Sequence, residues 1–149
     1  MTMMGTLIQM AKSAIQRLDD ISPVIDLAAR LYVANIFWKS GLTKIANWDS
    51  TVYLFTNLYN VPVLSPEIAA YSATMVELGG AVLLALGLAS RFGTAALLVL
   101  NIVAAISYPD LSDAGRELHV YWGMFLLIFL LHGPGKLSID YFIRKKLMG

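Results

Sequence analysis

The sequence predicts an all-α integral membrane protein, a four-helix bundle preceded by a short N-terminal interfacial amphipathic helix. Hydrophobic residues make up 58% of the 149 residues and charged residues only 14%, whereas soluble domains contain about 45–50% and about 25%. A domain this short could not bury so much apolar surface in water. The stretch from Ile68 to Ser90 also carries a single charge, Glu77, and is long enough to cross the ~30 Å hydrocarbon layer as a helix.

Composition excludes several classes of function. The chain has no cysteine, so by itself it forms no disulfide, thiolate metal site or thiol redox centre. The net charge is +1, and no basic stripe with interleaved aromatic residues is present, so we expect no nucleic-acid partner. The sequence also lacks a Ser-His-Asp set, a phosphate-binding loop and a dinucleotide-binding fingerprint.

Residues 1–20 are expected to form an amphipathic segment outside the bundle. Apolar residues recur there at helical spacing along one stripe, which is typical of a helix lying at the membrane surface. A disordered tail is the alternative. Ser22 and Pro23 then favour the start of a new helix, because Ser caps helices and Pro suits their first turn. The bundle itself is assigned to residues 21–149.

Four membrane-spanning helices are expected in this bundle. The first holds Asp26, Arg30 and Lys39, and the other three are more apolar. The aromatic-rich connection 47–66 is expected to lie at the interface or to fold over the helix ends. The predicted spans are about 23–42, 67–90, 92–108 and 119–134.

The distribution of Lys and Arg predicts the orientation. Four spans place both termini and the 89–92 turn on one side of the membrane. That side collects most of the basic residues, and basic residues favour the cytoplasmic side. We therefore expect a multi-pass protein that has the lipid bilayer as its first partner and both termini in the cytoplasm.

Four polar residues are expected to meet inside the membrane and to line a pocket for a ligand. At 1.5 Å per residue, Arg30 and Asn101 lie roughly 14 Å deep, and Asn35 and Glu77 about 20 Å deep. A charge at mid-span costs on the order of 2.5–3.5 kcal/mol on insertion scales. Such a residue therefore needs a partner, a water-filled cavity or a proton, and it is a candidate functional group.

Two pairings of Arg30 are compatible with the sequence. An ion pair with Glu77 across helices would satisfy both charges, either as a structural clamp or as part of a functional pocket. Alternatively, Asp26 lies four residues earlier on the same helix face and pairs with Arg30, which leaves Glu77 unpaired. His119 and His132 are about 20 Å apart along the fourth span and lack further ligands at suitable spacing, so no metal site is expected.

Three ordered motifs carry a family resemblance. After Arg30 come F-W-x-S-G-L-x-K at 37–44, E-L-G-G-x-x-L-L-x-L-G-L-x-x-R at 77–91 and G-P-G-K-L-S-I-D at 133–140. Together they resemble the DoxX family of small four-helix bacterial membrane proteins, over about residues 24–142. The resemblance implies a location in the bacterial cytoplasmic (inner) membrane. The further motif positions are Lys44, Arg91, Gly133, Pro134, Gly135 and Asp140.

The resemblance also implies a function. Some members are linked with membrane redox systems, including the small subunit of thiosulfate:quinone oxidoreductase and partners in oxidative-stress complexes. We therefore expect an accessory subunit of a quinone-linked system without catalytic activity of its own, with a redox enzyme or a second copy as partner. The chain carries no redox centre of its own, so electrons would have to be carried by a partner or by a bound cofactor such as a quinone. A ligand-free assembly scaffold and a small transporter or proton pathway are the alternatives.

Overall fold

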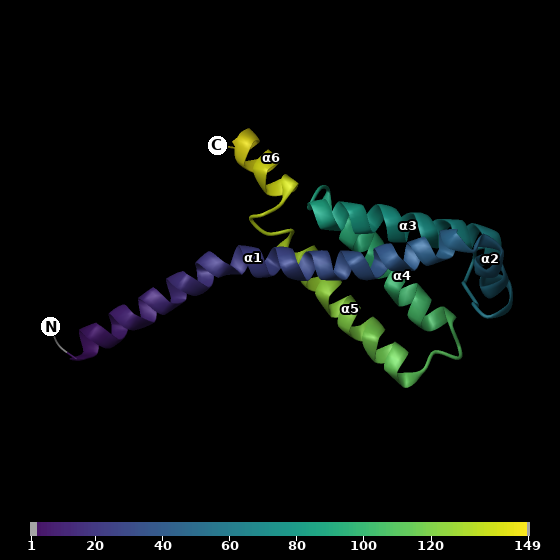
Figure 1. The fold of residues 1–149 in the computed structure, drawn as a ribbon, viewed down its shortest axis with the longest axis horizontal. Coiled ribbons are helices and arrows are strands. Elements are labelled where there is room, and N and C mark those ends of the chain that lie inside the picture. The colour runs from purple at the N-terminus through teal and green to yellow at the C-terminus, as the bar shows by residue number, and fades with distance from the viewer. Residues whose placement is uncertain (1–2, 149) are drawn as a thin grey trace.

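The computed structural model describes residues 3–148. These residues form helices and contain no strand, which confirms the all-α class. Four of the helices are long and apolar enough to cross a membrane, as expected. Figure 1 shows the first two long spans running alongside each other, the other two slanting away from them, and a short helix near each end of the bundle. The six helices are α1 (Met3–Ala46), α2 (Trp48–Asn57), α3 (Pro66–Leu86), α4 (Ser90–Ser107), α5 (Asp113–His132) and α6 (Ile139–Met148).

Helix α1 is continuous from Met3 to Ala46, with Pro23 inside it. The prediction that Ser22 and Pro23 start a new helix is therefore wrong. A proline removes one backbone hydrogen bond and bends a helix, but it need not end it. Figure 1 shows such a bend where the purple part of α1, which projects from the bundle, gives way to the blue part. The N-terminal segment is thus an extension of the first span.

The spans pack in the order α1, α3, α4 and α5. Helix α1 lies along α3, α3 packs on α4, and α4 packs on α5. The buried core between them is built mainly from aliphatic and phenylalanine side chains. Many large apolar side chains on the outer faces are exposed, as expected where lipid replaces water around the helices. The main core residues are Val33, Ala34, Phe37, Ala81, Leu84, Leu97, Leu126 and Phe129.

The connections define the two ends of the bundle. At one end, α2 packs on the first half of α3, with Phe55 against Ala69, Ala70 and Ala73, so the 47–66 segment does fold over helix ends. At the other end, a tight turn joins α3 to α4, and the chain leaves α5 toward α6. We call these the α2 end and the terminal end. Helix α5 begins earlier than predicted because the Ser112 hydroxyl accepts a hydrogen bond from the Gly115 amide at 3.1 Å.

Candidate functional site

A buried ion pair joins α1 to α3. The ammonium of Lys44 lies 2.8 Å from each carboxylate oxygen of Glu77. The Ser40 hydroxyl donates to Glu77 Oε1 at 3.0 Å and accepts from Lys44 Nζ at 3.1 Å. Ser40 and Lys44 are four residues apart, so they project from one face of α1. The Glu77 side chain is 9% exposed and that of Lys44 19%.

Gly41 allows the two helices to approach closely at this point. A β-carbon on Gly41 would lie 2.7 Å from the Leu78 side chain and 3.3 Å from the Glu77 β-carbon. Small residues at such crossings allow membrane helices to pack closely. The G in the F-W-x-S-G-L-x-K motif therefore has a packing role, and its neighbours Ser40 and Lys44 supply the polar contacts.

The ion pair forms part of the wall of a cavity of about 730 Å³, which we call the lateral cavity. Small alanines on α3 and α4 leave this space open, and apolar side chains form most of its surface. Phe92, which is 74% exposed on the outer face of α4, also lines it, so the cavity reaches the lipid-facing surface. Its other polar or aromatic lining residues are Ser40, Phe55, Tyr59, Ser72, His119 and Trp122.

Two further polar side chains of this wall, His119 and Tyr59, are held in place by their neighbours. The Asn101 amide donates to the His119 carbonyl at 2.8 Å, and its oxygen lies 2.8 Å from His119 Nδ1. Tyr59 stacks between Phe55 and Tyr108, with ring centroids 4.8 and 5.1 Å away. Burial raises the pKa of Tyr59 above its ordinary value, and nearby Tyr108 and Glu77 add to the shift. The phenol therefore stays a neutral hydrogen-bond donor at physiological pH.

Arg30 lies at the terminal end of the bundle, away from Glu77. Its guanidinium donates to the carbonyl of Pro134 and, at 2.7 Å, to that of Leu137, and the residue is 1% exposed. Among the described residues the one ion pair closer than 4.0 Å is Lys44–Glu77. Arg30 therefore pairs with neither of the carboxylates considered from the sequence.

The four residues expected to form one polar pocket lie in separate places. Glu77 is bound to Lys44, Asn101 to His119, and Arg30 to the α5–α6 connection. Asn35 is exposed on the outer face of α1. The estimate of depth failed because it started the first span at Pro23, whereas α1 is longer than the span. As a result Arg30 lies beside Gly87 at the end of α3, and Lys44 is the cation level with Glu77.

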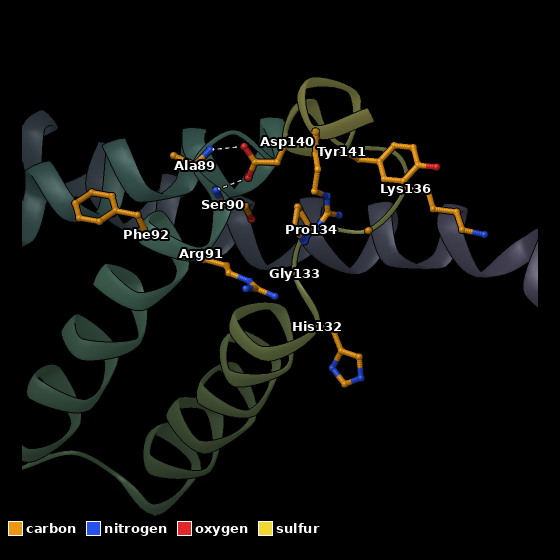
Figure 2. A pocket seen from close by; sticks show the side chains of 12 residues that line it. Ala89, Ser90, Arg91, Phe92, His132, Gly133, Pro134, Lys136, Asp140 and Tyr141 are labelled. Carbon is orange, nitrogen blue, oxygen red and sulfur yellow. Dashed lines mark hydrogen bonds between the residues drawn. The ribbon is translucent and has the colours of Figure 1, made fainter. Parts of the chain in front are cut away.

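The remaining motif residues meet at the terminal end, where they join α4 to α6. The Asp140 carboxylate accepts hydrogen bonds from the amides of Ala89 and Ser90, each at 2.8 Å. These bonds cap the first turn of α4, as Figure 2 shows. Gly133 and Gly135 adopt positive φ angles of 85° and 78°, which glycine tolerates best. The G-P-G-K-L-S-I-D motif thus forms the strap that Arg30 and the α3–α4 turn hold.

Sequence reasoning missed four residues of the lateral cavity. Ser40 and Lys44 carried a usable signal in their four-residue spacing, but the sequence identified Lys44 only as a motif position. The sequence placed Tyr59 only within the aromatic-rich connection 47–66, and it raised His119 only as a metal ligand. Both are in fact polar groups on the wall of a cavity, and only the packing of α2 and α5 against the bundle reveals this.

The fold and the buried polar groups define a small four-span membrane protein with a lipid-accessible cavity. The DoxX family model matches residues 25–109, and the chain belongs to this family. It is 32% identical to inner membrane protein YphA of Escherichia coli over 129 residues, covering 79% of this chain and 89% of that protein. An uncharacterized protein of Haemophilus influenzae is 32% identical over 127 residues, covering 80% and 83%. No solved structure gives a significant match.

Proposed function

We propose that the protein is an accessory subunit of a membrane redox system and that the lateral cavity binds a quinone or a similar amphipathic molecule. The observation that carries the proposal is the combination of an apolar cavity open to lipid with a polar wall formed by Lys44, Glu77 and Tyr59. Its volume of about 730 Å³ falls within the usual range for small-molecule sites, about 300–1,000 Å³.

The chemistry of the wall suits a quinone head group. Quinone carbonyl oxygens accept hydrogen bonds, and the Tyr59 phenol and the Lys44 ammonium can donate them. Exposed Phe92 lies where an isoprenoid tail would pass into the bilayer. A bound quinone would supply the electron-transfer chemistry. The residues of this chain would bind and orient the head group and exclude water, while a partner enzyme would deliver the electrons.

The binding test uses the fluorescence of Trp122, which lines the cavity. Replacing Trp38 and Trp48 with phenylalanine leaves Trp122 as the sole tryptophan of the three. Titration of the purified protein with a short-chain ubiquinone should quench this fluorescence saturably. Tyr59→Phe should weaken binding about five- to tenfold, the equivalent of one hydrogen bond. Tyr53→Phe, on the exposed face of α2, is the matched control.

Two results would contradict the cavity proposal. Quenching that does not saturate would indicate partition of the quinone into detergent, and an equal effect of both tyrosine variants would exclude a site at Tyr59. Retention of function by a folded Glu77→Gln variant without quinone binding would favour the ligand-free scaffold. Solute flux from the purified protein in liposomes would favour the transporter.

The redox role is tested separately by purification from native membranes. A quinone-reactive oxidoreductase should co-purify with the tagged protein, and quinone should be present among the extracted lipids. Recovery of the protein as a homo-oligomer free of any oxidoreductase would contradict the accessory role, even if the cavity binds quinone.

The orientation is a further proposal. Both termini are proposed to face the cytoplasm of a bacterial inner membrane, because the terminal end collects most of the Lys and Arg residues. The relative named as an inner membrane protein supports this location. A phosphatase reporter fused after Met148 should be inactive, and a fluorescent protein fused there should fold. An active phosphatase would reverse the orientation.

A further inference from the structure

A second pocket, of about 430 Å³, lies at the terminal end of the bundle. It is separate from the lateral cavity except at Phe92, which lines both. Its walls come from the start of α4, the end of α5, the strap and the first turns of α6. Figure 2 shows Arg91 extending toward Gly133 on one side and Asp140 facing the α3–α4 turn on another. We call it the basic pocket because of its charged residues, Arg91, Lys136, Asp140 and Arg144.

The charge of the basic pocket is positive and largely unneutralised. Three cations and one carboxylate give a net charge of +2 when His132 is neutral. Asp140 is already engaged, since both of its oxygens accept backbone amides at 2.8 Å. None of the three cations has a carboxylate within 4.0 Å among the described residues. Arg91 makes one long hydrogen bond, 3.3 Å to the carbonyl of Leu131.

The walls of the basic pocket are fixed before any ligand arrives. Buried Arg30 holds the carbonyls of Pro134 and Leu137 from behind. The Ser138 hydroxyl donates to the Gly135 carbonyl at 2.7 Å, and the Asp140 amide donates to the Gly87 carbonyl at 2.9 Å. A pocket held in this way loses little conformational entropy on binding.

The position of the pocket indicates the layer of the membrane that it meets. Span α4 begins at the pocket and span α5 ends there, so the pocket lies at the level of the lipid head groups. Phe92 is 74% exposed beside it, and α6 carries exposed Phe142 and Leu147 together with Lys145 and Lys146. Such a basic amphipathic helix is typical of the membrane interface. Apolar surface for acyl chains therefore adjoins a cationic hollow.

We propose that the basic pocket binds the phosphate head group of an anionic glycerophospholipid, with its acyl chains lying against Phe92 and the outer face of α4. The ligand chemistry is a phosphodiester anion held by Arg91, Lys136 and Arg144. Phosphodiesters accept hydrogen bonds from guanidinium groups in a fork-like geometry, and basic pockets between membrane helices are recurrent lipid sites. Phe92 lines both pockets, so the two ligands would share apolar surface there, but the residues that hold the phosphate do not line the lateral cavity.

The test compares two pairs of substitutions that remove the same charge from the same end of the molecule. K136Q/R144Q removes two cations of the basic pocket, whereas K145Q/K146Q removes two cations of α6 that do not line it. Bound phosphatidylglycerol is measured by native mass spectrometry of protein extracted from nanodiscs of mixed phosphatidylglycerol and phosphatidylcholine. K136Q/R144Q should lower phosphatidylglycerol binding by about tenfold or more, and K145Q/K146Q by no more than about twofold.

The remaining outcomes decide the source of the anion. The charge-preserving variant K136R/R144K should restore most of the lipid binding, which shows that the loss does not come from unfolding. An equal loss in both neutralised pairs would overturn the proposal in favour of a diffuse surface field. Inorganic phosphate that displaces the lipid and raises the melting temperature as much as phosphatidylglycerol does would also overturn it, because the site would then recognise a free anion.

Discussion

Helix α1 carries two buried cations that are satisfied in different ways. Arg30, at the terminal end, is 1% exposed and donates to two backbone carbonyls of the strap. Lys44, near the α2 end, has a side chain that is 19% exposed and meets the carboxylate of Glu77. Arg30 is enclosed by the backbone of the strap, and Lys44 lies on the wall of a cavity of about 730 Å³.

The difference separates a structural cation from a candidate functional one. Backbone carbonyls cannot move without unfolding the strap, so Arg30 is fixed to one arrangement. The Lys44–Glu77 pair consists of two side chains, and either can turn toward a ligand that enters the cavity. A rigid fork suits the first role, and a compact, rotatable ammonium suits the second. A charged side chain inside a membrane protein is therefore evidence for a functional site only when its partners leave it accessible to a ligand.

The largest effect is expected at Arg30. Arg30→Met should lower the free energy of unfolding by about 2–5 kcal/mol, because two buried carbonyls each lose a charged hydrogen-bond donor worth about 1–3 kcal/mol. The carbonyls of Pro134 and Leu137 would lose their donors, and the strap would detach. Denaturant unfolding in detergent measures the loss. A cost below about 1 kcal/mol, the level of a single ordinary hydrogen bond, would show that the strap is held by other contacts.

An intermediate effect is expected for the ion pair. Lys44→Met and Glu77→Gln should each destabilise the protein, and the double variant should cost less than the sum, with a coupling energy of about 1–3 kcal/mol. The control cycle, Arg30→Met with Glu77→Gln, should be additive within about 0.5 kcal/mol because these residues share no contact. Thermal unfolding of the purified variants measures both cycles. A coupling energy above about 0.5 kcal/mol in the control cycle would show that Arg30 and Glu77 do interact.

The smallest effect concerns the glycine beside the ion pair. Gly41→Ala should cost about 1 kcal/mol, since the added carbon would lie 2.7 Å from the Leu78 side chain, which must shift to make room. Gly79→Ala is the matched control, because no heavy atom lies within 4 Å of the added carbon. It should be neutral or stabilise α3 by up to about 1 kcal/mol through helix propensity. Equal effects would mean that α1 and α3 do not pack closely at Gly41.

Much of the architecture could be predicted from the sequence. The apolar runs around Glu77 and through α4 are long enough to specify spans, and their order with the three motifs identifies the family. The segment 47–66 is aromatic enough to predict a cover for the helix ends. The prediction at Pro23 was wrong because proline favours the start of a helix but does not require one. In this protein α1 continues through Pro23.

The polar contacts could not be predicted because they depend on how far one helix is shifted along another. The sequence gives the position of a residue along its own helix. Whether two side chains on different helices can form a hydrogen bond depends also on how far one helix is shifted along the other. A shift of a few residues exchanges Arg30 for Lys44 as the partner of Glu77. The acceptors of Arg30 could not be predicted either, because they are backbone carbonyls. Every residue has a backbone carbonyl, and no side-chain pattern indicates which ones accept a hydrogen bond.

The contacts of Arg30 also order events during synthesis. Arg30 belongs to the first span, and its acceptors lie 104 and 107 residues later, near the end of the chain. Until residues 134–137 leave the ribosome, the guanidinium lacks both of its backbone acceptors. Insertion of the first span is therefore completed by the last part of the protein. A chain terminated before Pro134 lacks both of these acceptors, which distinguishes an unfinished product from a finished one.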